Sequence, residues 1–309
     1  MANALVELSE ALSAAVEYAG RGVVGIVEGG QYGVSGTVWR EGVIVTAEHT
    51  IRGEDEVTVV LPSGEKVKAK VAGRDPSTDV AVIKLGDAGE GSAKLTPSPQ
   101  ANAREAKVGS IVLAIGRGAK ENAGLSASYG VISATGEQWR TSTGGKVDSW
   151  LRLDLLPYPG FSGGPLIDAN GRALGINTSG PRRSIVTIPT ETINRVVDQL
   201  LAKGRISRGY LGLAMQPVGV PAALQKALGL QAARGLLVVT AAPGGPAEKG
   251  GVLVGDLIVA LNGAPVERLG DLQNALDAEN VGKPLKLRIL RGGKPTDVTV
   301  TVAERTGDE

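Results

Sequence analysis

About a dozen short apolar segments, separated by turns rich in Gly and Pro, fill the chain between residues 21 and 201. The first six lie at Val23–Val27, Gly36–Trp39, Val43–Thr46, Val57–Leu61, Val67–Val71 and Val80–Leu85. Six more lie at Val108–Ile115, Tyr129–Ser133, Leu151–Leu155, Pro165–Ile167, Ala173–Asn177 and Ile185–Ile188. Segments of this length and spacing predict β-strands, and no helical pattern lies between them. We therefore expect a mostly β fold with two barrels lying face to face.

Helical patterns flank this β region. In residues 1–20 apolar residues recur at helical spacing, at Leu5, Leu8, Leu12 and Val16. This predicts an amphipathic helix that packs on the β region or on a neighbouring subunit. A second helix begins at Thr190, after Pro189, and ends at Gly204. Residues 204–207 are then a short linker.

From residue 208 to residue 305 strands and helices alternate. Helices are predicted at residues 221–228 and 269–278, and strands at residues 236–240, 256–261, 285–290 and 298–302. Asn262-Gly263 is a strong signal for a two-residue hairpin turn. This pattern predicts a separate α+β domain.

The segment Gly160-Phe161-Ser162-Gly163-Gly164 places a serine among glycines. Glycines allow a tight turn in which amide N–H groups point at one spot, an arrangement that suits a nucleophile beside an oxyanion hole. A plain loop before a strand would carry the same residues. A serine nucleophile also needs a base within reach.

The chain has one histidine, so an imidazole base for Ser162 has to be His49. His49 follows an apolar strand, which places its ring at a strand end. Asp79, at the start of the strand Val80–Leu85, is the strongest candidate for the acid that orients the ring. Taken alone, His49 would also fit a structural role, and Asp79 a turn-capping one.

Composition excludes several other classes of site. The chain carries 33 basic and 32 acidic residues, so no charge excess indicates a nucleic acid or an anionic membrane as partner. With no cysteine and one histidine, disulfides are excluded and a zinc site is not expected. No apolar run is long enough to span a bilayer. Gly116-Arg117-Gly118 lacks the context of a nucleotide-binding loop, and we expect no cofactor.

Three segments together resemble the HtrA/Deg family of trypsin-like serine proteases. Thr46-Ala47-Glu48-His49 is similar to that family's Thr-x-x-His, residues 75–85 to its Asp-x-x-Thr-Asp segment with the following aliphatic strand, and residues 160–166 to its Gly-Asn-Ser-Gly-Gly-Pro-Leu. The order His49, Asp79, Ser162 is that of the chymotrypsin-type triad. By this resemblance residues 21–203 form a chymotrypsin-like double-barrel protease domain.

Residues 208–305 resemble a PDZ domain, including its Gly-x-x-x-Gly-Asp-x-Ile segment at Gly251 to Ile258. Such domains bind a C-terminal peptide as an added strand. The resemblance implies a carboxylate-binding loop at Tyr210-Leu211-Gly212-Leu213, with Leu272 and Leu276 lining the side-chain pocket. Both leucines would also fit the core.

The resemblance implies an ATP-independent endopeptidase for unfolded proteins. His49 would accept the Ser162 proton, Asp79 would orient the imidazole, and the N–H groups of Gly160 and Ser162 would hold the oxyanion. The substrate pocket, near Pro157 and residues 176–178, should prefer small or aliphatic P1 residues. Phe161, the only phenylalanine, stands where the family has Asn, and we expect it to affect the state of this loop.

Other interpretations stay open at this point. A catalytically weak protease-like chaperone or adaptor would bind unfolded chains through the second domain, and an unrelated two-domain β-rich binding protein would share the pattern by accident. The family suggests a homotrimer or larger homo-oligomer. If Met1 is the natural start, the protein is cytoplasmic; if a leader was removed, it is periplasmic or otherwise extracytoplasmic. Residues 140–147 are expected to form a mobile loop.

Overall fold

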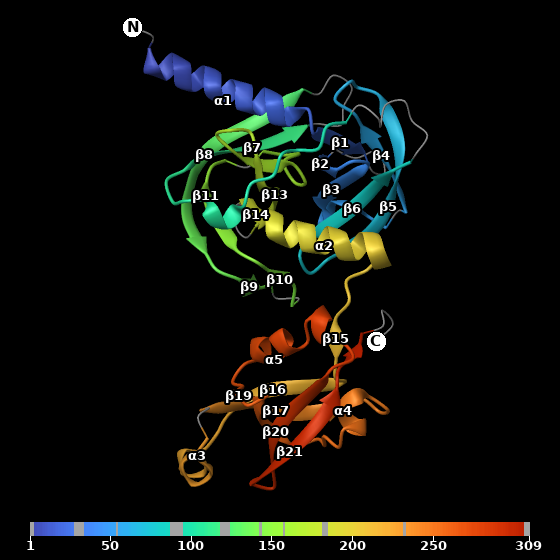
Figure 1. Cartoon of the computed structure of the whole chain (residues 1–309), viewed down its shortest axis with the longest axis vertical. Helices are drawn as coiled ribbons and strands as arrows, with labels where there is room; N and C mark the ends of the chain where they lie inside the picture. The colour runs from blue at the N-terminus through green and yellow to red at the C-terminus, as the bar shows by residue number, and fades with distance from the viewer. Residues whose placement is uncertain are drawn as a thin grey trace. The chain divides into compact units, whose positions relative to one another are not determined.

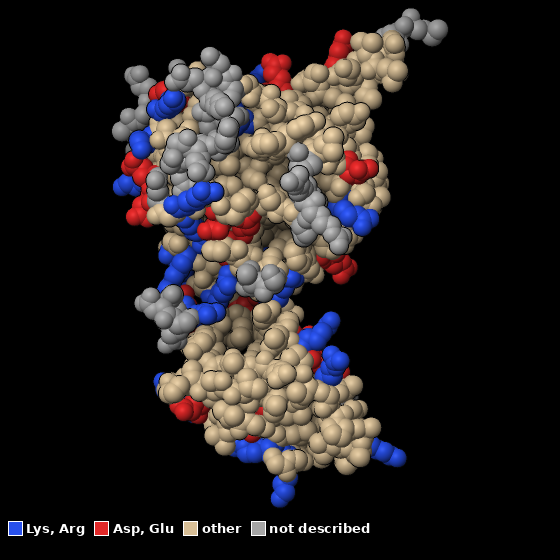
Figure 2. Space-filling view, turned by 180° about the vertical axis from the view of Figure 1, so that it is seen from behind, with Lys and Arg blue, Asp and Glu red and all other residues tan. Residues whose placement is uncertain are grey.

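The computed structural model describes residues 3–27, 34–53, 55–86, 95–117, 124–141, 144–156, 158–180, 185–230 and 233–305. The chain forms two compact units, residues 1–206 and residues 207–309 (Figure 1). No helix among the described residues is both long and apolar enough to cross a membrane. On the face of the first unit drawn in Figure 2, basic and acidic side chains are interspersed.

The first unit contains two closed antiparallel barrels, blue and green to yellow in Figure 1. The N-terminal barrel has the strand order β1-β2-β3-β6-β5-β4. Its strands are β1 (Val23–Val27), β2 (Val34–Arg40), β3 (Val43–Ala47), β4 (Glu56–Val60), β5 (Lys66–Asp75) and β6 (Val80–Leu85). Alternating apolar side chains of these strands, such as Ile26, Ile44 and Ile83, fill the barrel interior.

The C-terminal barrel has the order β11-β14-β13-β12-β7-β8. Its strands are β7 (Ile111–Arg117), β8 (Leu125–Gly136), β11 (Trp150–Asp154), β12 (Pro165–Asp168), β13 (Ala173–Ser179) and β14 (Ile185–Pro189). The hairpin turn between β12 and β13 uses Gly171 at a φ of 78°. The double-barrel expectation is therefore confirmed.

Helix α2 (Thr190–Lys203) lies across both barrels and ends at Gly204, whose φ is 70°. Its residues Ile193, Val196 and Leu200 pack in one cluster with side chains of β3 and β6 from one barrel and β13 and β14 from the other. Trp39 joins this cluster and donates its indole N–H to Asn194 Oδ1 at 2.8 Å. Because α2 buries residues of both barrels in a single core, it fixes their relative position.

Helix α1 (Ala4–Gly20) packs on the C-terminal barrel through its second half alone. Leu12 and Val16 contact a cluster that includes Leu113 and Ile167, whereas Leu5 is 75% exposed. The amphipathic pattern correctly predicts the helix. Its expected apolar face is not buried as a whole, because the barrel does not extend under the first two turns.

The second unit is a sheet in the order β16-β17-β18-β20-β21, with helices against it. Its strands are β16 (Leu213–Gly219), β17 (Arg234–Ala241), β18 (Leu257–Leu261), β20 (Pro284–Arg291) and β21 (Lys294–Thr301). Strands β15 (Gly209–Tyr210) and β22 (Ala303–Glu304) pair, and β19 (Ala264–Pro265) pairs with β18. The helices are α3 (Ala222–Leu228), α4 (Pro246–Lys249) and α5 (Leu269–Ala275).

Candidate active site

His49 lies in a short 3₁₀ turn (Glu48–Thr50) that directly follows β3, and Asp79 lies in the turn between β5 and β6. Strands β3 and β6 pair with Ala47 opposite Val80, so the two turns meet at one end of the barrel. The backbone confirms this meeting, because Glu48 N–H donates to the Asp79 carbonyl at 3.1 Å. Two neighbouring strands thus bring the imidazole to the carboxylate.

The His49 ring and the Asp79 carboxylate are in direct contact. His49 Nδ1 lies 2.9 Å from Asp79 Oδ2 and 3.0 Å from Oδ1, and the His49 backbone N–H donates to Oδ1 at 2.8 Å. With Nδ1–H donating to the carboxylate, Nε2 is the nitrogen left with a free lone pair. This tautomer is the one that a general base requires.

No pattern in the sequence indicated the third donor to Asp79. The Thr178 hydroxyl, at the end of β13 in the other barrel, donates to Asp79 Oδ2. Thr178 lies 99 positions away, so no local pattern links the two residues. In the segment 176–178, where the resemblance implies a substrate pocket, the Thr178 hydroxyl donates to Asp79 and Ile176 is fully buried; the pocket itself stays a prediction. Pro157 lies outside the described residues.

These contacts shift both pKa values. The hydrogen bond to Asp79 raises the pKa of His49 above its ordinary value, and partial burial opposes this only in part. Burial by itself would raise the pKa of Asp79, but the hydrogen bonds from His49 and Thr178 outweigh it, so the pKa of Asp79 is lowered. The pair therefore favours an ionised carboxylate beside a ring that takes up a proton readily.

Asp79 adopts a left-handed backbone conformation, with φ at 58°. Such a conformation is unusual for a residue other than glycine, and Asp is one of the side chains that tolerate it. The preceding turn is held by Asp75, which is buried and accepts hydrogen bonds from the hydroxyls of Ser77 and Thr78 at 2.6 Å each. The turn thus presents the Asp79 side chain to the ring in a fixed direction.

Residues 139–148 lie beside this turn. The loop expected at residues 140–147 is closed at its base by a strand pair, β9 (Trp139–Arg140) with β10 (Lys146–Val147); residues 142 and 143 lie outside the described residues, and the mobility of the loop stays a prediction. The Thr141 hydroxyl donates to the Ser77 carbonyl at 2.8 Å. The hairpin is thereby attached to the turn that carries Asp79.

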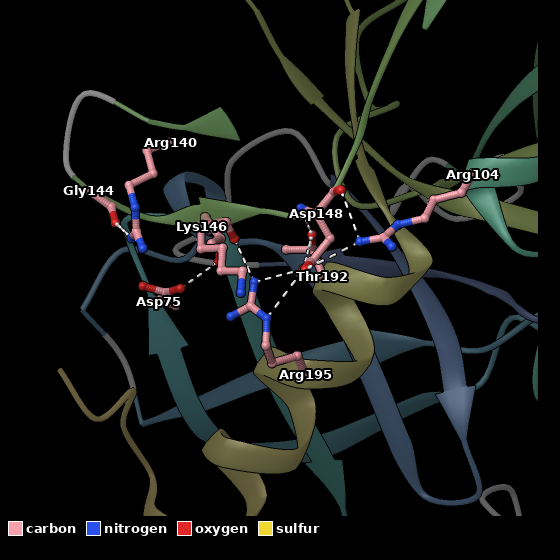
Figure 3. A network of polar contacts seen from close by, with 9 residues as sticks. Asp75, Arg104, Arg140, Gly144, Lys146, Asp148, Thr192 and Arg195 are labelled. Atoms are coloured by element: carbon pink, nitrogen blue, oxygen red, sulfur yellow. Dashed lines mark hydrogen bonds and ion pairs between the residues drawn. The ribbon is translucent and has the colours of Figure 1, made fainter. Parts of the chain in front are cut away.

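Figure 3 shows how this region is anchored to α2. Arg195 donates to Asp148 Oδ2 at 3.0 Å and to the Lys146 carbonyl at 2.6 Å, and Thr192 donates to the same carboxylate oxygen at 3.0 Å. Arg104 reaches the Asp148 carbonyl at 3.3 Å from the opposite side. Side chains of α2 thus hold the segment between β9 and β11.

Ser162 lies in the turn before β12, within the C-terminal barrel. Its backbone carbonyl accepts a hydrogen bond from Ser35 N–H at 3.0 Å, and the next residue, Gly163, donates to the Asn177 carbonyl at 2.8 Å. A Cβ on Gly163 would collide with the Ser35 carbonyl and with the Thr46 hydroxyl. The serine turn is therefore pressed against β2 and the end of β3, three residues before His49.

The structure does not join Ser162 to the other two residues by a hydrogen bond. Among the described residues, the Ser162 hydroxyl has no hydrogen-bond partner, and neither do the backbone N–H groups of Gly160 and Ser162. An oxyanion site needs N–H groups that no acceptor of the protein itself takes up, and these two N–H groups, one of them on Gly160 at a φ of 94°, meet that need. Apo active sites often lack the serine–histidine hydrogen bond.

Phe161 is buried, with 3% of its surface exposed, in the core of the C-terminal barrel. A Cβ added at Gly116 of β7 would lie 2.5 Å from the Phe161 ring, so the absence of a side chain there makes room for it. Tyr158 packs edge-on against Phe161, with ring centroids 5.6 Å apart. The residue before Ser162 is thus part of the barrel core.

The predicted peptide-binding residues lie together in the second unit, in different environments. Leu211 and Leu272 are buried in its core, which fits the open alternative for Leu272, whereas Leu213 and Leu276 pack against that core and stay partly exposed. Tyr210 belongs to β15, and Gly212, at a φ of 76°, forms the turn between β15 and β16. Strand β16 is an edge strand beside α5, so one side of it is open to pairing.

Two antiparallel barrels with a His–Asp pair where they meet, followed by a small sheet with an open edge strand, define a trypsin-like fold joined to a PDZ-like module. Comparison with known proteins agrees. Residues 34–176 match the family model for the trypsin-like peptidase domain, and residues 209–302 match the PDZ domain model. The chain belongs to the HtrA/Deg family of trypsin-like serine proteases, with one PDZ domain.

Two curated relatives are named as probable periplasmic serine endoproteases, DegP-like. The one from Chlamydia trachomatis serovar D is 36% identical over 275 residues, covering 86% of this chain and 53% of the relative. The one from Rhizobium meliloti is 34% identical over 277 residues, covering 88% of this chain and 53% of the relative. The chain therefore spans about half the length of the curated relatives it matches.

Solved structures match along nearly the whole chain. The HtrA-type protease AlgW with a decapeptide has a TM-score of 0.75 at 25% identity, covering 97% of this chain and 99% of that one. The serine endoprotease from Yersinia pestis has a TM-score of 0.75 at 27% identity, covering 96% and 98%. The likeness includes both the double barrel and the PDZ domain.

Proposed function

We propose that this chain is an ATP-independent serine endopeptidase that cleaves unfolded or misfolded proteins. The observation that carries the proposal is the His49–Asp79 contact of 2.9 Å, with Nε2 left free, at the end of the barrel against which the Ser162 turn is pressed. The names of the curated relatives, serine endoproteases, support the same activity.

In the proposed mechanism Ser162 Oγ attacks the substrate carbonyl while His49 Nε2 accepts the hydroxyl proton. Asp79 holds the Nδ1–H and stabilises the imidazolium that forms, and its lowered pKa keeps it ionised. The N–H groups of Gly160 and Ser162 donate to the oxyanion of the tetrahedral intermediate. His49 then returns the proton to the leaving amine, and water hydrolyses the acyl-enzyme by the same route.

We propose that the PDZ domain binds a C-terminal or extended hydrophobic peptide along β16. The N–H and C=O groups on the open side of this strand would pair with the peptide. Gly212 and its neighbours would hold the carboxylate, and Leu213 and Leu276, both partly exposed, would contact its side chains. The decapeptide in the AlgW structure supports peptide binding by a related protein.

A defined assay separates this proposal from a protease-like scaffold that only binds unfolded chains. Wild type and Ser162→Ala are incubated with a denatured protein, with and without a peptide that has a hydrophobic C-terminus, and fragments are followed over time. We expect degradation by wild type and none by Ser162→Ala, together with labelling of wild type alone by a fluorophosphonate. Equal degradation by both would refute the serine mechanism, and absence of degradation and labelling would favour the scaffold.

We also propose an extracytoplasmic location and self-assembly into a trimer or larger oligomer. The curated relatives are named as periplasmic, which favours this location over the cytoplasmic alternative. Leu5 and Leu8 on the first half of α1 are 75% and 44% exposed, so they offer an apolar surface to a second copy. Sedimentation of wild type and of a Leu5→Glu, Leu8→Glu double variant tests the assembly; equal masses would argue against this surface.

A further inference from the structure

Ser35 is a fully buried polar residue on β2 of the N-terminal barrel. Its polar atoms are directed to the other barrel or to the strand that leads to His49. Its N–H donates to the Ser162 carbonyl at 3.0 Å, and its carbonyl accepts from the Thr46 hydroxyl at 2.7 Å. Its hydroxyl lies 2.6 Å from the Gly160 carbonyl. No motif in the sequence pointed to this residue.

The geometry fixes the direction of the Ser35 hydroxyl. Arg117 N–H, at the end of β7, donates to Ser35 Oγ at 2.8 Å and so occupies one of its lone pairs. The hydroxyl proton then goes to the Gly160 carbonyl at 2.6 Å, which is much closer than the other acceptor, the Arg117 carbonyl at 3.4 Å. Ser35 thereby connects β7 to the nucleophile turn through one oxygen atom.

Ser35 holds two peptide groups of this turn, one directly before Phe161 and one directly after Ser162. The Gly160 carbonyl belongs to the peptide group between Gly160 and Phe161. The Ser162 carbonyl belongs to the peptide group between Ser162 and Gly163. Gly160, at a φ of 94°, has no side chain to restrict its backbone, so an external contact has to define the direction of its peptide groups. The peptide between Phe161 and Ser162, which carries the Ser162 N–H, lies between these two held peptides, and the N–H groups of Gly160 and Ser162 have no acceptor among the described residues.

Other residues do not replace Ser35 easily. Alanine lacks both the donor and the acceptor. A larger side chain has little room, because Ser35 is fully buried and packs so close to Gly164 that a Cβ built on that glycine would lie 3.2 Å from the Ser35 Cβ. The site therefore requires a small side chain that both donates and accepts a hydrogen bond, which serine provides.

We propose that Ser35 is a positioning residue for the proposed hydrolysis: through its hydrogen bonds to Gly160 and Ser162 it holds the oxyanion hole of one barrel in place from the other barrel. It touches neither substrate nor reacting atoms. The inference rests on the proposed function, since it assigns a role in the same site.

The test compares kcat and KM for an internally quenched peptide between wild type and Ser35→Ala. We expect kcat to fall about tenfold to a hundredfold, somewhat less than for complete loss of an oxyanion donor. KM should stay within about twofold, and the midpoint of the acid limb of kcat/KM should not move, because the His49–Asp79 contact is untouched.

Thr190→Val is the matched control, because Thr190 is buried and donates its hydroxyl to a backbone carbonyl, that of Ala101, at 2.8 Å. It should keep wild-type kcat, although its melting temperature should fall about as much as that of Ser35→Ala. If Ser35→Ala does not fold, Ser35→Cys, a weaker donor of similar shape, is measured instead.

The role is overturned if kcat of the Ser35 variant stays within about twofold of Thr190→Val, or if the loss of kcat comes with a shifted pH midpoint. Wild-type turnover that depends on Ser162 is established first. If wild type shows none, the proposed function fails and the role of Ser35 falls with it; if wild type is active and Ser35→Ala is equally active, only the role of Ser35 fails.

Discussion

Phe161 offers the sharpest test of how the turn before β12 is built, because only 3% of its surface is exposed while the neighbouring Ser162 is the proposed nucleophile. Phe161→Ala would remove the ring from the core of the C-terminal barrel and leave a cavity beside Gly116. Truncation of a buried phenylalanine costs about 3 to 5 kcal/mol of unfolding free energy, and the edge-on contact with Tyr158 places the expectation in the upper half of that range.

The assay is urea unfolding followed by tryptophan fluorescence. All three tryptophans, Trp39, Trp139 and Trp150, belong to the first unit, so the signal reports on that unit in the full chain. We expect a lower urea midpoint at an unchanged slope, and in a thermal melt a shift of roughly 10 °C for a unit of this size.

Two control variants make the result specific. Tyr129→Ala removes an aromatic ring that is 71% exposed and should change the unfolding free energy by no more than about 0.5 kcal/mol. Phe161→Leu keeps most of the buried volume and should cost about 1 kcal/mol. If Phe161→Ala unfolds at the same urea concentration as Tyr129→Ala, the ring does not hold the turn to the core, and the reasoning is refuted.

Three further predictions concern charged residues. Asp79→Asn should lower kcat about 10⁴-fold, because the amide no longer fixes the base tautomer of His49; steady-state kinetics would contradict this with a loss below tenfold. Asp79 raises the pKa of His49, so kcat/KM of wild type should fall as the pH drops through a value above 6.5. In Asp79→Asn the midpoint of this fall should move to lower pH. An unmoved midpoint would show that Asp79 does not raise the pKa of His49. In the PDZ domain burial by itself would raise the pKa of Asp256, but the hydrogen bonds from Arg291 and from Leu253 N–H, with the charge of Arg291, together lower it. The stability from this ion pair should therefore be present above the ordinary pKa of 3.8 and lost as the pH falls through the lowered value. Asp256→Asn should lower the stability of the PDZ domain, because Asp256 is buried and loses the charged contact with Arg291 at 2.7 Å. Hydrogen exchange of β18 amides measures the loss, and unchanged protection would contradict it.

The strands of the double barrel could be predicted from local pattern. β1 and β6 were predicted at the bounds that the structure shows, and Asn170-Gly171, a pair typical of hairpin turns, lies between β12 and β13. The predicted strand ends were less accurate. β5 extends to Asp75 and β8 begins at Leu125, because pairing with a neighbouring strand continues beyond the apolar residues. The short pairs β9–β10 and β15–β22 were missed, since two residues carry no periodicity.

The sequence alone determined the small set of residues from which a hydrolytic site could be assembled. A single histidine, a serine among glycines and an aspartate at a strand entrance restrict the chemistry, because side-chain identity limits which atoms can accept a proton or attack a carbonyl. Only the tertiary structure decided which groups support them. Thr178 on Asp79 and Ser35 on Gly160 act across 99 and 125 positions of sequence, between two barrels. Hydrogen bonds over such separations depend on how the barrels pack, and no local pattern records that packing.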